Sequence, residues 1–325
     1  MKQDYSKTDF TTDLNLWQKV MYYLVWGIVY SVSLLPFPVI YGISDFLYII
    51  IYKVAKYRRA LTRKNLRDSF PEKSEAELLD IERKFYHYFC DYIMETFKLA
   101  SMSKEEMRRR VNYSNLEVLH EHMRRGNNMI CYFGHYCNWE WLTSIGLHCI
   151  NGFQVGQVYH ILENKVMNAV ILKIRSAMGT ESISMQILLR KVVEKRRNNQ
   201  PILLGFNSDQ VPLYQATRHW TDFLNHKDTL VITGTEQVAR KFDFVCLYAD
   251  YTRIRRGYYN LEVKTLCLHP KDTPEWSITD MYFKELEKTI RNAPQYWLWT
   301  HNRWKRTREG FEEWKKNEEE KKANA

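Results

Sequence analysis

The side chains best suited to catalysis lie between Gly134 and Glu140, where His135 stands five residues before Glu140. A histidine can act as a general base near neutral pH. A carboxylate that reaches back to its ring fixes the tautomer and stabilises the imidazolium that forms. His135 and Glu140 are therefore the candidate catalytic pair, and the expected chemistry is proton abstraction from a hydroxyl or from water.

The spacing of this pair is a weak signal by itself, because about 0.7 such pairs are expected by chance in a chain of this composition. On spacing alone, an ordinary histidine at a capped helix start is the simpler interpretation. The context is more specific. Met129–Phe133 is typical of a buried strand, Gly134 follows it, and Asn138–Cys149 is predicted to be a helix. Ligands of open α/β sheets bind at the carboxyl ends of strands, and a helix start offers N–H donors to an oxyanion.

The elements that must position this pair alternate along the chain from about residue 72. Such alternation predicts an α/β fold with a mixed, largely parallel central sheet flanked by helices. The predicted strands are Met129–Phe133, Phe153–Tyr159, Ile202–Phe206, Trp220–Leu224, Phe244–Tyr251 and Tyr259–Leu268. The predicted helices are Glu75–Leu99, Asn138–Cys149, Lys165–Met178, Ile187–Arg197, Gly234–Phe242 and Ile278–Arg291.

An apolar segment precedes this domain. Asp45 is the only charged residue between Val20 and Tyr52, and Pro36 and Pro38 divide the stretch. Three membrane arrangements compete: one spanning helix, a re-entrant hairpin, or a helix in the interface. A buried helix pair of a soluble protein stays open as the fourth. The basic residues that follow, between 53 and 67, favour a cytoplasmic flank beside anionic head groups. We therefore predict an N-terminal membrane-associated helical segment.

Net charge, hydropathy and cysteine spacing limit the kinds of function that fit this chain. The 325 residues carry a net charge of +10, which favours anionic partners such as acidic proteins, anionic lipids or nucleic acid. A mean hydropathy of −0.49 excludes a polytopic membrane protein. The six cysteines lack paired metal-ligand spacings, so we expect no metal site, and we expect no cofactor. The expected division is a polar N-terminus (1–19), a membrane anchor or interfacial hairpin (20–54), a catalytic domain (55–308) and a charged solvated tail (309–325).

Further motifs follow His135 in a fixed order. They are Val158-Tyr159 with Glu163-Asn164-Lys165, then Arg175 and Gly179, then Asn207-Ser208-Asp209-Gln210, then the run from Ala293 to Trp299 with His301-Asn302-Arg303-Trp304-Lys305. With this set the chain resembles the late acyltransferases of lipid A biosynthesis, the lauroyl/myristoyl transferase family of Gram-negative bacteria. The resemblance runs almost to the C-terminal tail. Departures are Tyr136-Cys137 after the histidine, Asn302 in place of an arginine, and a tail without Arg-Pro.

The resemblance implies an O-acyltransferase with a glycerolipid acyltransferase-like fold, on the cytoplasmic side of the bacterial inner membrane. The donor would be an acyl carrier protein thioester and the acceptor a hydroxyl of a lipid A precursor. His135 would be the base, Glu140 would polarise it, and no covalent acyl-enzyme would form.

The resemblance also marks Arg175, Asp209, Arg303 and Lys305 as candidate substrate-binding residues. Arg175 could hold a phosphate, the thioester oxygen or a structural carboxylate, or form only a surface salt bridge. Asp209 could position the acceptor, pair with Arg175, or simply cap a turn. Arg303 and Lys305 could bind lipid phosphates or flank the tryptophans around them.

Other interpretations stay open. The same chemistry could act on another membrane lipid or glycolipid hydroxyl, with acyl-CoA as donor. A non-catalytic lipid-binding protein on the membrane surface would tolerate loss of His135 and Glu140. Nucleic-acid binding fits the charge, but no recognition motif is present, so we expect no nucleic-acid partner. A thioesterase with water as acceptor is conceivable, although no G-x-S-x-G elbow occurs.

Overall fold

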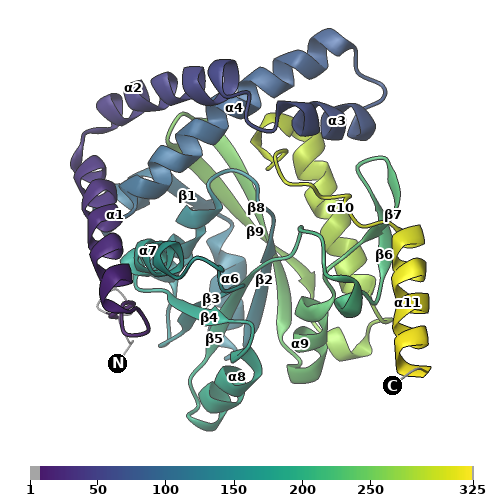
Figure 1. Ribbon diagram of the computed structural model, residues 1–325. Coiled ribbons are helices and arrows are strands. Elements are labelled where there is room, and N and C mark those ends of the chain that lie inside the picture. Colours follow the sequence, from purple (N-terminus) through teal and green to yellow (C-terminus); the bar gives the residue numbers. More distant parts are fainter. Residues whose placement is uncertain (1–7, 324–325) are drawn as a thin grey trace.

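The computed structural model describes residues 8–323, in which a seven-stranded sheet is flanked by helices (Figure 1). Its strand order is β1-β9-β8-β2-β5-β3-β4, and every neighbouring pair is parallel except the β8–β9 hairpin. The predicted mixed, largely parallel sheet is therefore confirmed. The strands are β1 Val111–Ser114, β2 Met129–Phe133, β3 Gln154–Tyr159, β4 Glu181–Ser184, β5 Ile202–Asn207, β8 Val245–Arg255 and β9 Tyr258–Cys267.

The α-helices of the described residues include most of those predicted, with ends that agree within three residues. They are α1 Leu16–Leu34, α2 Phe37–Tyr48, α3 Arg59–Ser69, α4 Glu75–Lys98, α5 Lys104–Arg110, α6 Leu116–Arg124, α7 Lys165–Arg175, α8 Leu188–Arg197, α9 Gly234–Phe242, α10 Ser277–Asn292 and α11 Arg308–Ala323. The other helical segments of the described residues are the π-helix η2 Ile49–Val54 and the 3₁₀ helices η3 Trp139–His148, η4 Ser176–Met178, η5 Tyr214–Ala216, η6 Pro270–Asp272 and η7 Pro294–Tyr296.

Three sequence predictions differ from the observed elements. The predicted helix after His135 is a 3₁₀ helix, η3. The predicted strand at Trp220 is present as β6, Trp220–Phe223, but it pairs with β7, His226–Leu230, in a separate two-stranded sheet. The short edge strands β1 and β4 were not predicted, because a run of four residues is too short to give a clear periodic signal.

Strands β2 and β5 lie side by side in the sheet and position the site. Both are continuous apolar runs, as expected of strands covered on both faces. Their parallel register pairs Phe133 with Asn207. The residues that follow the two strands therefore leave the same edge of the sheet together, and two positions further on these are His135 and Asp209.

The N-terminal apolar segment forms two helices that part at Leu35 and Pro36, both in an extended conformation. Helix α1 packs against α4 and α7, and α2 packs against α4. One helix of the described residues, Phe37–Val54, is long and apolar enough to cross a membrane, and only 22% of it is buried inside the protein. That finding is weak support for a spanning segment, so membrane association stays a prediction. Residues 1–7 of the predicted polar N-terminus lie outside the described range.

A buried polar network ties α2 to the catalytic domain. The carboxylate of Glu95 on α4 accepts hydrogen bonds from Tyr41 on α2 at 3.0 Å and from Asn138, just before η3, at 2.9 Å. Asp91 on the same helix pairs with Arg253 at 2.7 Å and with Arg256 at 2.6 Å. Helix α2 is thus fixed to the catalytic domain near the start of η3.

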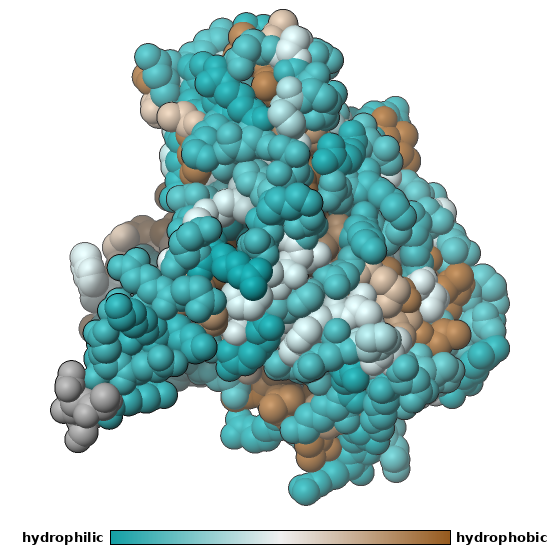
Figure 2. Space-filling model, turned by 90° about the vertical axis from the view of Figure 1, so that its right-hand side faces the viewer, coloured by the Kyte–Doolittle hydropathy of each residue, from teal (hydrophilic) through white to brown (hydrophobic). Residues whose placement is uncertain are grey.

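The predicted solvated tail forms α11, which is exposed over most of its length. Two of its aromatic residues nevertheless pack against the domain: Phe311 meets Trp220 and Trp314 stacks on Tyr214. Figure 2 shows the face on this side of the molecule, which is mostly hydrophilic with apolar areas between the polar ones. Residues 324 and 325 of the predicted tail lie outside the described range.

Candidate active site

The imidazole of His135 is held between two residues of the loop after β5. Its Nδ1 lies 2.6 Å from Asp209 Oδ1, and its Nε2 lies 3.1 Å from the amide nitrogen of Gln210. A carboxylate can only accept and an amide nitrogen can only donate. The arrangement therefore fits a neutral ring with its proton on Nδ1 and a lone pair on Nε2, the tautomer that a base acting through Nε2 requires.

Asp209 is the carboxylate partner of His135. Its other oxygen, Oδ2, accepts the backbone N–H of His135 at 2.9 Å and the indole N–H of Trp297 at 2.8 Å. Burial raises the pKa of Asp209, but the electrostatic interaction with the His135 ring and the hydrogen bonds from His135 and Trp297 outweigh burial and lower it to about 2. Asp209 is therefore ionised at neutral pH. The sequence analysis offered it as a substrate-binding residue, a partner of Arg175 or a turn cap, and the structure places it beside the His135 ring.

Glu140 does not contact the His135 ring, contrary to our expectation. It forms a bidentate ion pair with Arg175 at the end of α7, with both N–O distances 2.7 Å. Two local features turn its carboxylate away from the ring: Cys137 has a left-handed backbone (φ 50°), and the following helix is a 3₁₀ helix. Of the partners considered for Arg175, the structure shows the carboxylate.

Glu140 acts on His135 through Trp139. The Trp139 indole N–H donates to Glu140 Oε1 at 3.1 Å, and the indole ring meets the His135 ring edge to face, with centroids 5.0 Å apart. Tyr92 stacks on the same indole at 4.0 Å. The ion pair of Glu140 and Arg175 thereby fixes the wall against which the imidazole rests.

Breaking the pair between Glu140 and Arg175 is expected to destabilise the protein. Glu140→Gln leaves the Arg175 guanidinium without its charged partner, which costs about 2–4 kcal/mol of unfolding free energy, less than for a pair without solvent access. The reduced value reflects the 18% exposure of the Arg175 side chain, against 3% for Glu140. Chemical denaturation of the wild type and of Glu140→Gln measures this difference in unfolding free energy.

The control for this prediction is the exposed pair of Arg67 and Glu75. Glu75→Gln should leave the denaturation midpoint almost unchanged, because exposed ion pairs contribute little. An equally small effect of Glu140→Gln would contradict the structural role assigned to the buried pair.

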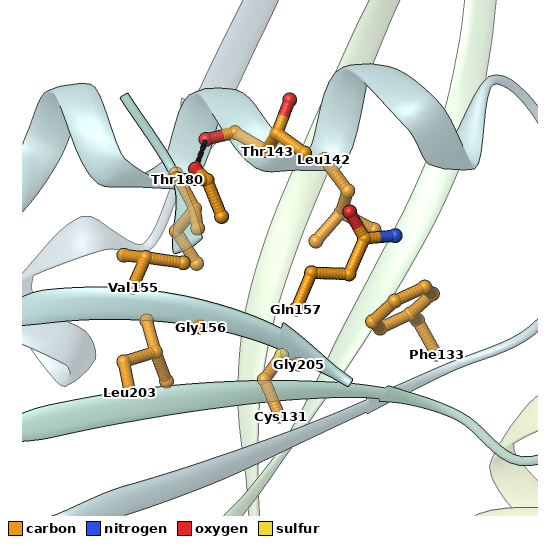
Figure 3. A pocket seen from close by; sticks show the side chains of 11 residues that line it. Cys131, Phe133, Leu142, Thr143, Val155, Gly156, Gln157, Thr180, Leu203 and Gly205 are labelled. Carbon is orange, nitrogen blue, oxygen red and sulfur yellow. Dashed lines mark hydrogen bonds between the residues drawn. The ribbon is translucent and has the colours of Figure 1, made fainter. Parts of the chain in front are cut away.

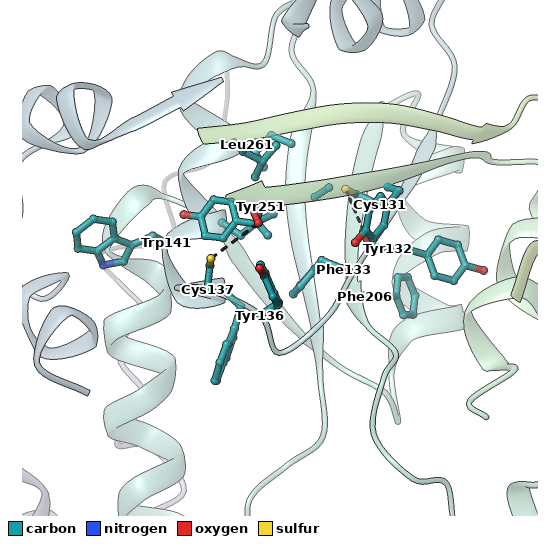
Figure 4. Packing of buried hydrophobic residues seen from close by; sticks show 14 of the residues in the cluster. Cys131, Tyr132, Phe133, Tyr136, Cys137, Trp141, Phe206, Tyr251 and Leu261 are labelled. Carbon is teal, nitrogen blue, oxygen red and sulfur yellow. Dashed lines mark hydrogen bonds between the residues drawn. The ribbon is translucent and has the colours of Figure 1, made fainter. Parts of the chain in front are cut away.

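A C-terminal segment fastens the loop that carries His135. The backbone N–H of Leu298 donates to the His135 carbonyl at 3.1 Å, and the Cys137 N–H donates to the Tyr296 carbonyl at 3.0 Å. Tyr136 and Trp297 form the β-bridge between these bonds. Figure 4 shows Tyr136 and Cys137 packed among buried aromatic residues beneath this loop. The conspicuous Pro-Gln-Tyr-Trp motif is thus a clamp on the catalytic loop.

The two basic candidates of the C-terminal motif differ in exposure. Arg303 is only 1% exposed, its guanidinium donates to the Leu230 carbonyl at 2.6 Å, and burial lowers its pKa to about 10. This position does not fit the expectation that Arg303 binds a lipid phosphate at the surface. Lys305 is exposed, so that expectation remains for it as a prediction.

A small apolar cavity lies between η3 and the strands β2, β5 and β3 (Figure 3). Its volume is about 20 Å³, room for a single water-sized group, so an acyl chain does not enter it without movement of the walls. It is lined by Cys131, Phe133, Leu142, Thr143, Ile145, Val155, Gly156, Gln157, Thr180, Leu203 and Gly205. Within residues 8–323, no group of three His, Cys, Asp or Glu side chains is placed to hold a metal ion.

Sequence reasoning missed three contributors to the site: Trp139, Gln210 and Trp297. One signal could have found the pairing of His135 with Asp209. Each residue lies two positions beyond a predicted buried strand, and neighbouring parallel strands bring such positions together. The roles of the two tryptophans have no comparable signal, because they depend on how distant segments fold onto the loop.

Comparison with known proteins identifies relatives of the whole chain. Residues 7–306 match the family described as bacterial lipid A biosynthesis acyltransferase. The chain is also 23% identical over 298 residues to a lipid A biosynthesis lauroyltransferase of Escherichia coli (strain K12), across 89% of this chain and 94% of that protein.

Proposed function

The chain belongs to the bacterial lipid A biosynthesis acyltransferase family, and we propose that it moves a fatty acyl chain from an acyl carrier protein thioester to a hydroxyl of a lipid A precursor. One observation carries the chemistry: a histidine paired with a buried carboxylate through Nδ1, with its unprotonated Nε2 on the side of the ring away from that carboxylate, at the carboxyl edge of the sheet. This arrangement suits a general base.

The reaction proceeds in two proton transfers. His135 Nε2 takes the proton of the acceptor hydroxyl as its oxygen bonds to the thioester carbonyl carbon. The tetrahedral intermediate then collapses, the carbon–sulfur bond breaks, and the imidazolium returns the proton to the leaving sulfur. Asp209, ionised beside Nδ1, stabilises the imidazolium that exists between the two transfers.

The direct mechanism needs no covalent acyl-enzyme. The cysteine nearest in sequence to the base is Cys137, whose side chain is buried and donates to the Tyr251 carbonyl. Burial raises the pKa of the Cys137 thiol well above its ordinary value, so it stays protonated and a poor nucleophile. The role of Glu140 in this proposal is to hold Trp139 against the base together with Arg175.

Membrane attachment through the N-terminal helices completes the proposal and would place the enzyme on the cytoplasmic side of the inner membrane. Apolar side chains such as Leu16, Trp17 and Phe46 are more than 60% exposed on α1 and α2. Lys53 and the arginines that follow it supply positive charge beside them. Cell fractionation tests this: recovery of the full chain in the soluble fraction at low salt would contradict attachment.

The transfer assay tests the reaction. Membranes that contain the wild-type protein or His135→Ala receive labelled acyl carrier protein thioester and a tetra-acylated, Kdo-bearing lipid A precursor. Mass spectrometry then looks for one added acyl chain. We expect the chain to be gained only with the wild type.

Other outcomes of this assay separate the alternatives. Transfer of label into another lipid, or transfer from acyl-CoA in place of the carrier protein thioester, would keep the base but move the acceptor or the donor. Absence of transfer to any lipid, with wild type and variant alike, would favour the lipid-binding protein over the enzyme.

A further inference from the structure

The Nε2 atom that must receive the acceptor's proton already has a partner in the free protein. The amide nitrogen of Gln210 lies 3.1 Å from it. A hydroxyl about to lose its proton must lie within about 2.6–3.2 Å of the base. Gln210 therefore occupies the position that the acceptor oxygen takes in the reaction, and the amide must leave before any hydroxyl or water can be activated.

We propose that Gln210 is a gate that keeps water from His135 until the lipid hydroxyl arrives, and so favours acyl transfer over hydrolysis of the bound thioester. This inference rests on the proposed function, because it concerns the fate of a bound acyl donor. Gln210 is a positioning residue in this scheme, because it takes no part in the bond changes and only controls which molecule can reach His135.

The reaction that the gate suppresses uses the same base. A water molecule would give one proton to His135 Nε2 while its oxygen bonds to the thioester carbonyl carbon. The carbon–sulfur bond would break, the leaving sulfur would take the proton from the imidazolium, and a free fatty acid would result. Nothing in the pairing of His135 with Asp209 distinguishes water from a lipid hydroxyl, so the distinction must come from access.

The gate discriminates because the two competitors differ in their other contacts. Water or the lipid hydroxyl must replace the hydrogen bond from the Gln210 amide to His135 Nε2 with a hydrogen bond of its own. The two hydrogen bonds are of nearly equal strength. A lipid also binds the protein through its remaining groups, and that remote binding energy can hold the hydroxyl in place of the amide. Water brings no further contacts, so it competes with a tethered amide at a disadvantage.

The local structure allows Gln210 to move while its neighbour stays fixed. Asp209 is 2% exposed and held by His135 and Trp297, whereas Gln210 is half-buried in a segment without helix or strand. Among the described residues, the Gln210 side chain makes one hydrogen bond, to His135 Nε2. Rotation about its own side-chain bonds therefore frees the base without disturbing the carboxylate behind it.

The test measures hydrolysis and transfer by purified full-length protein with a dodecanoyl thioester of acyl carrier protein. Gln210→Ala removes the amide, and Gln210→Asn retracts it by one methylene. In the absence of lipid acceptor, each variant should release free fatty acid roughly 2- to 12-fold faster than wild type, the range that corresponds to one net hydrogen bond. The ratio of free acid to acylated lipid should rise by a similar factor when acceptor is present.

Two controls accompany these variants. Gln215→Ala removes an exposed glutamine of the 3₁₀ helix that follows this loop, Tyr214–Ala216, and its ratio of free acid to acylated lipid should match that of wild type. The double variant Gln210→Ala/His135→Ala should lose the extra hydrolysis, because the extra hydrolysis depends on the base. Thermal unfolding of each variant shows whether it has folded.

The outcomes separate this inference from the proposed function. If Gln210 merely orients the His135 ring, its loss should slow hydrolysis and transfer together, which would overturn the gate. Unchanged hydrolysis in folded variants, or extra hydrolysis that survives in the double variant, would overturn it too. Failure of the wild type to transfer an acyl chain to any lipid would instead count against the proposed function.

Discussion

His135→Ala is expected to slow acyl transfer by a factor of about 100 to 10,000, the usual contribution of a positioned general base. The alanine leaves no group to take the hydroxyl proton, while the fold around it should persist because the ring is a half-buried part of the loop. The measurement is the initial rate of acyl transfer at saturating donor, with both proteins at the same concentration in membranes.

The control for this variant is His120→Ala, which removes a histidine whose ring bonds only to the His148 carbonyl at the far end of η3. That change should leave the transfer rate within a few-fold of wild type. A fall of less than tenfold for His135→Ala would show that His135 is not the general base of the transfer reaction.

Asp209→Asn is expected to produce a loss of comparable size, by changing the tautomer of the base. The oxygen that accepts from the His135 backbone and from Trp297 must remain an acceptor, so the new amide nitrogen takes the place beside Nδ1. An amide nitrogen donates, and it therefore drives the imidazole proton to Nε2. The lone pair then points at the asparagine instead of at the acceptor. In serine hydrolases the corresponding change lowers the rate by about 10,000-fold with the geometry intact.

Two comparisons make the Asp209→Asn result decisive. The double variant Asp209→Asn/His135→Ala should be scarcely slower than His135→Ala, because residues that act as one unit are not additive. Glu140→Gln should be less impaired in rate at a temperature where it is folded, since Glu140 reaches the base only through Trp139. Equal rates for wild type and Asp209→Asn would show that the pair is structural.

Periodicity of the sequence predicted the sheet well where strands are long and apolar, and poorly elsewhere. Met129–Phe133 is found at the predicted bounds, because a run of five buried residues ending at a glycine has few alternatives. Strand β4, Glu181–Ser184, was not predicted, because it becomes a strand by pairing with β3 at the edge of the sheet, and this pairing cannot be read from its own four residues. The order of the strands also depends on such pairings, which a single sequence does not show.

His135 lies just after a buried strand, as predicted, but the carboxylate that pairs with its ring is Asp209 and not Glu140. The expectation for Glu140 assumed that closeness in sequence implies contact. The left-handed backbone at Cys137 and the 3₁₀ geometry of η3 turn Glu140 toward Arg175 instead. Asp209 reaches the ring from a different strand, and only the register of β2 against β5 makes that approach apparent.

The clamp of the C-terminal segment on the loop that carries His135 affects when, during translation of this protein, that loop can take its final structure. The hydroxyl of Tyr136 donates to a carbonyl 157 residues later in the chain, and the backbone bond from Leu298 to His135 spans a similar separation. Proteins begin to fold from the N-terminus while they are being translated. The sheet of this protein can start to assemble on the ribosome, but the loop that carries His135 lacks its fastening until residues 293–298 have emerged. A nascent chain, or one terminated before these residues, is therefore expected to bind the membrane without being able to acylate lipid.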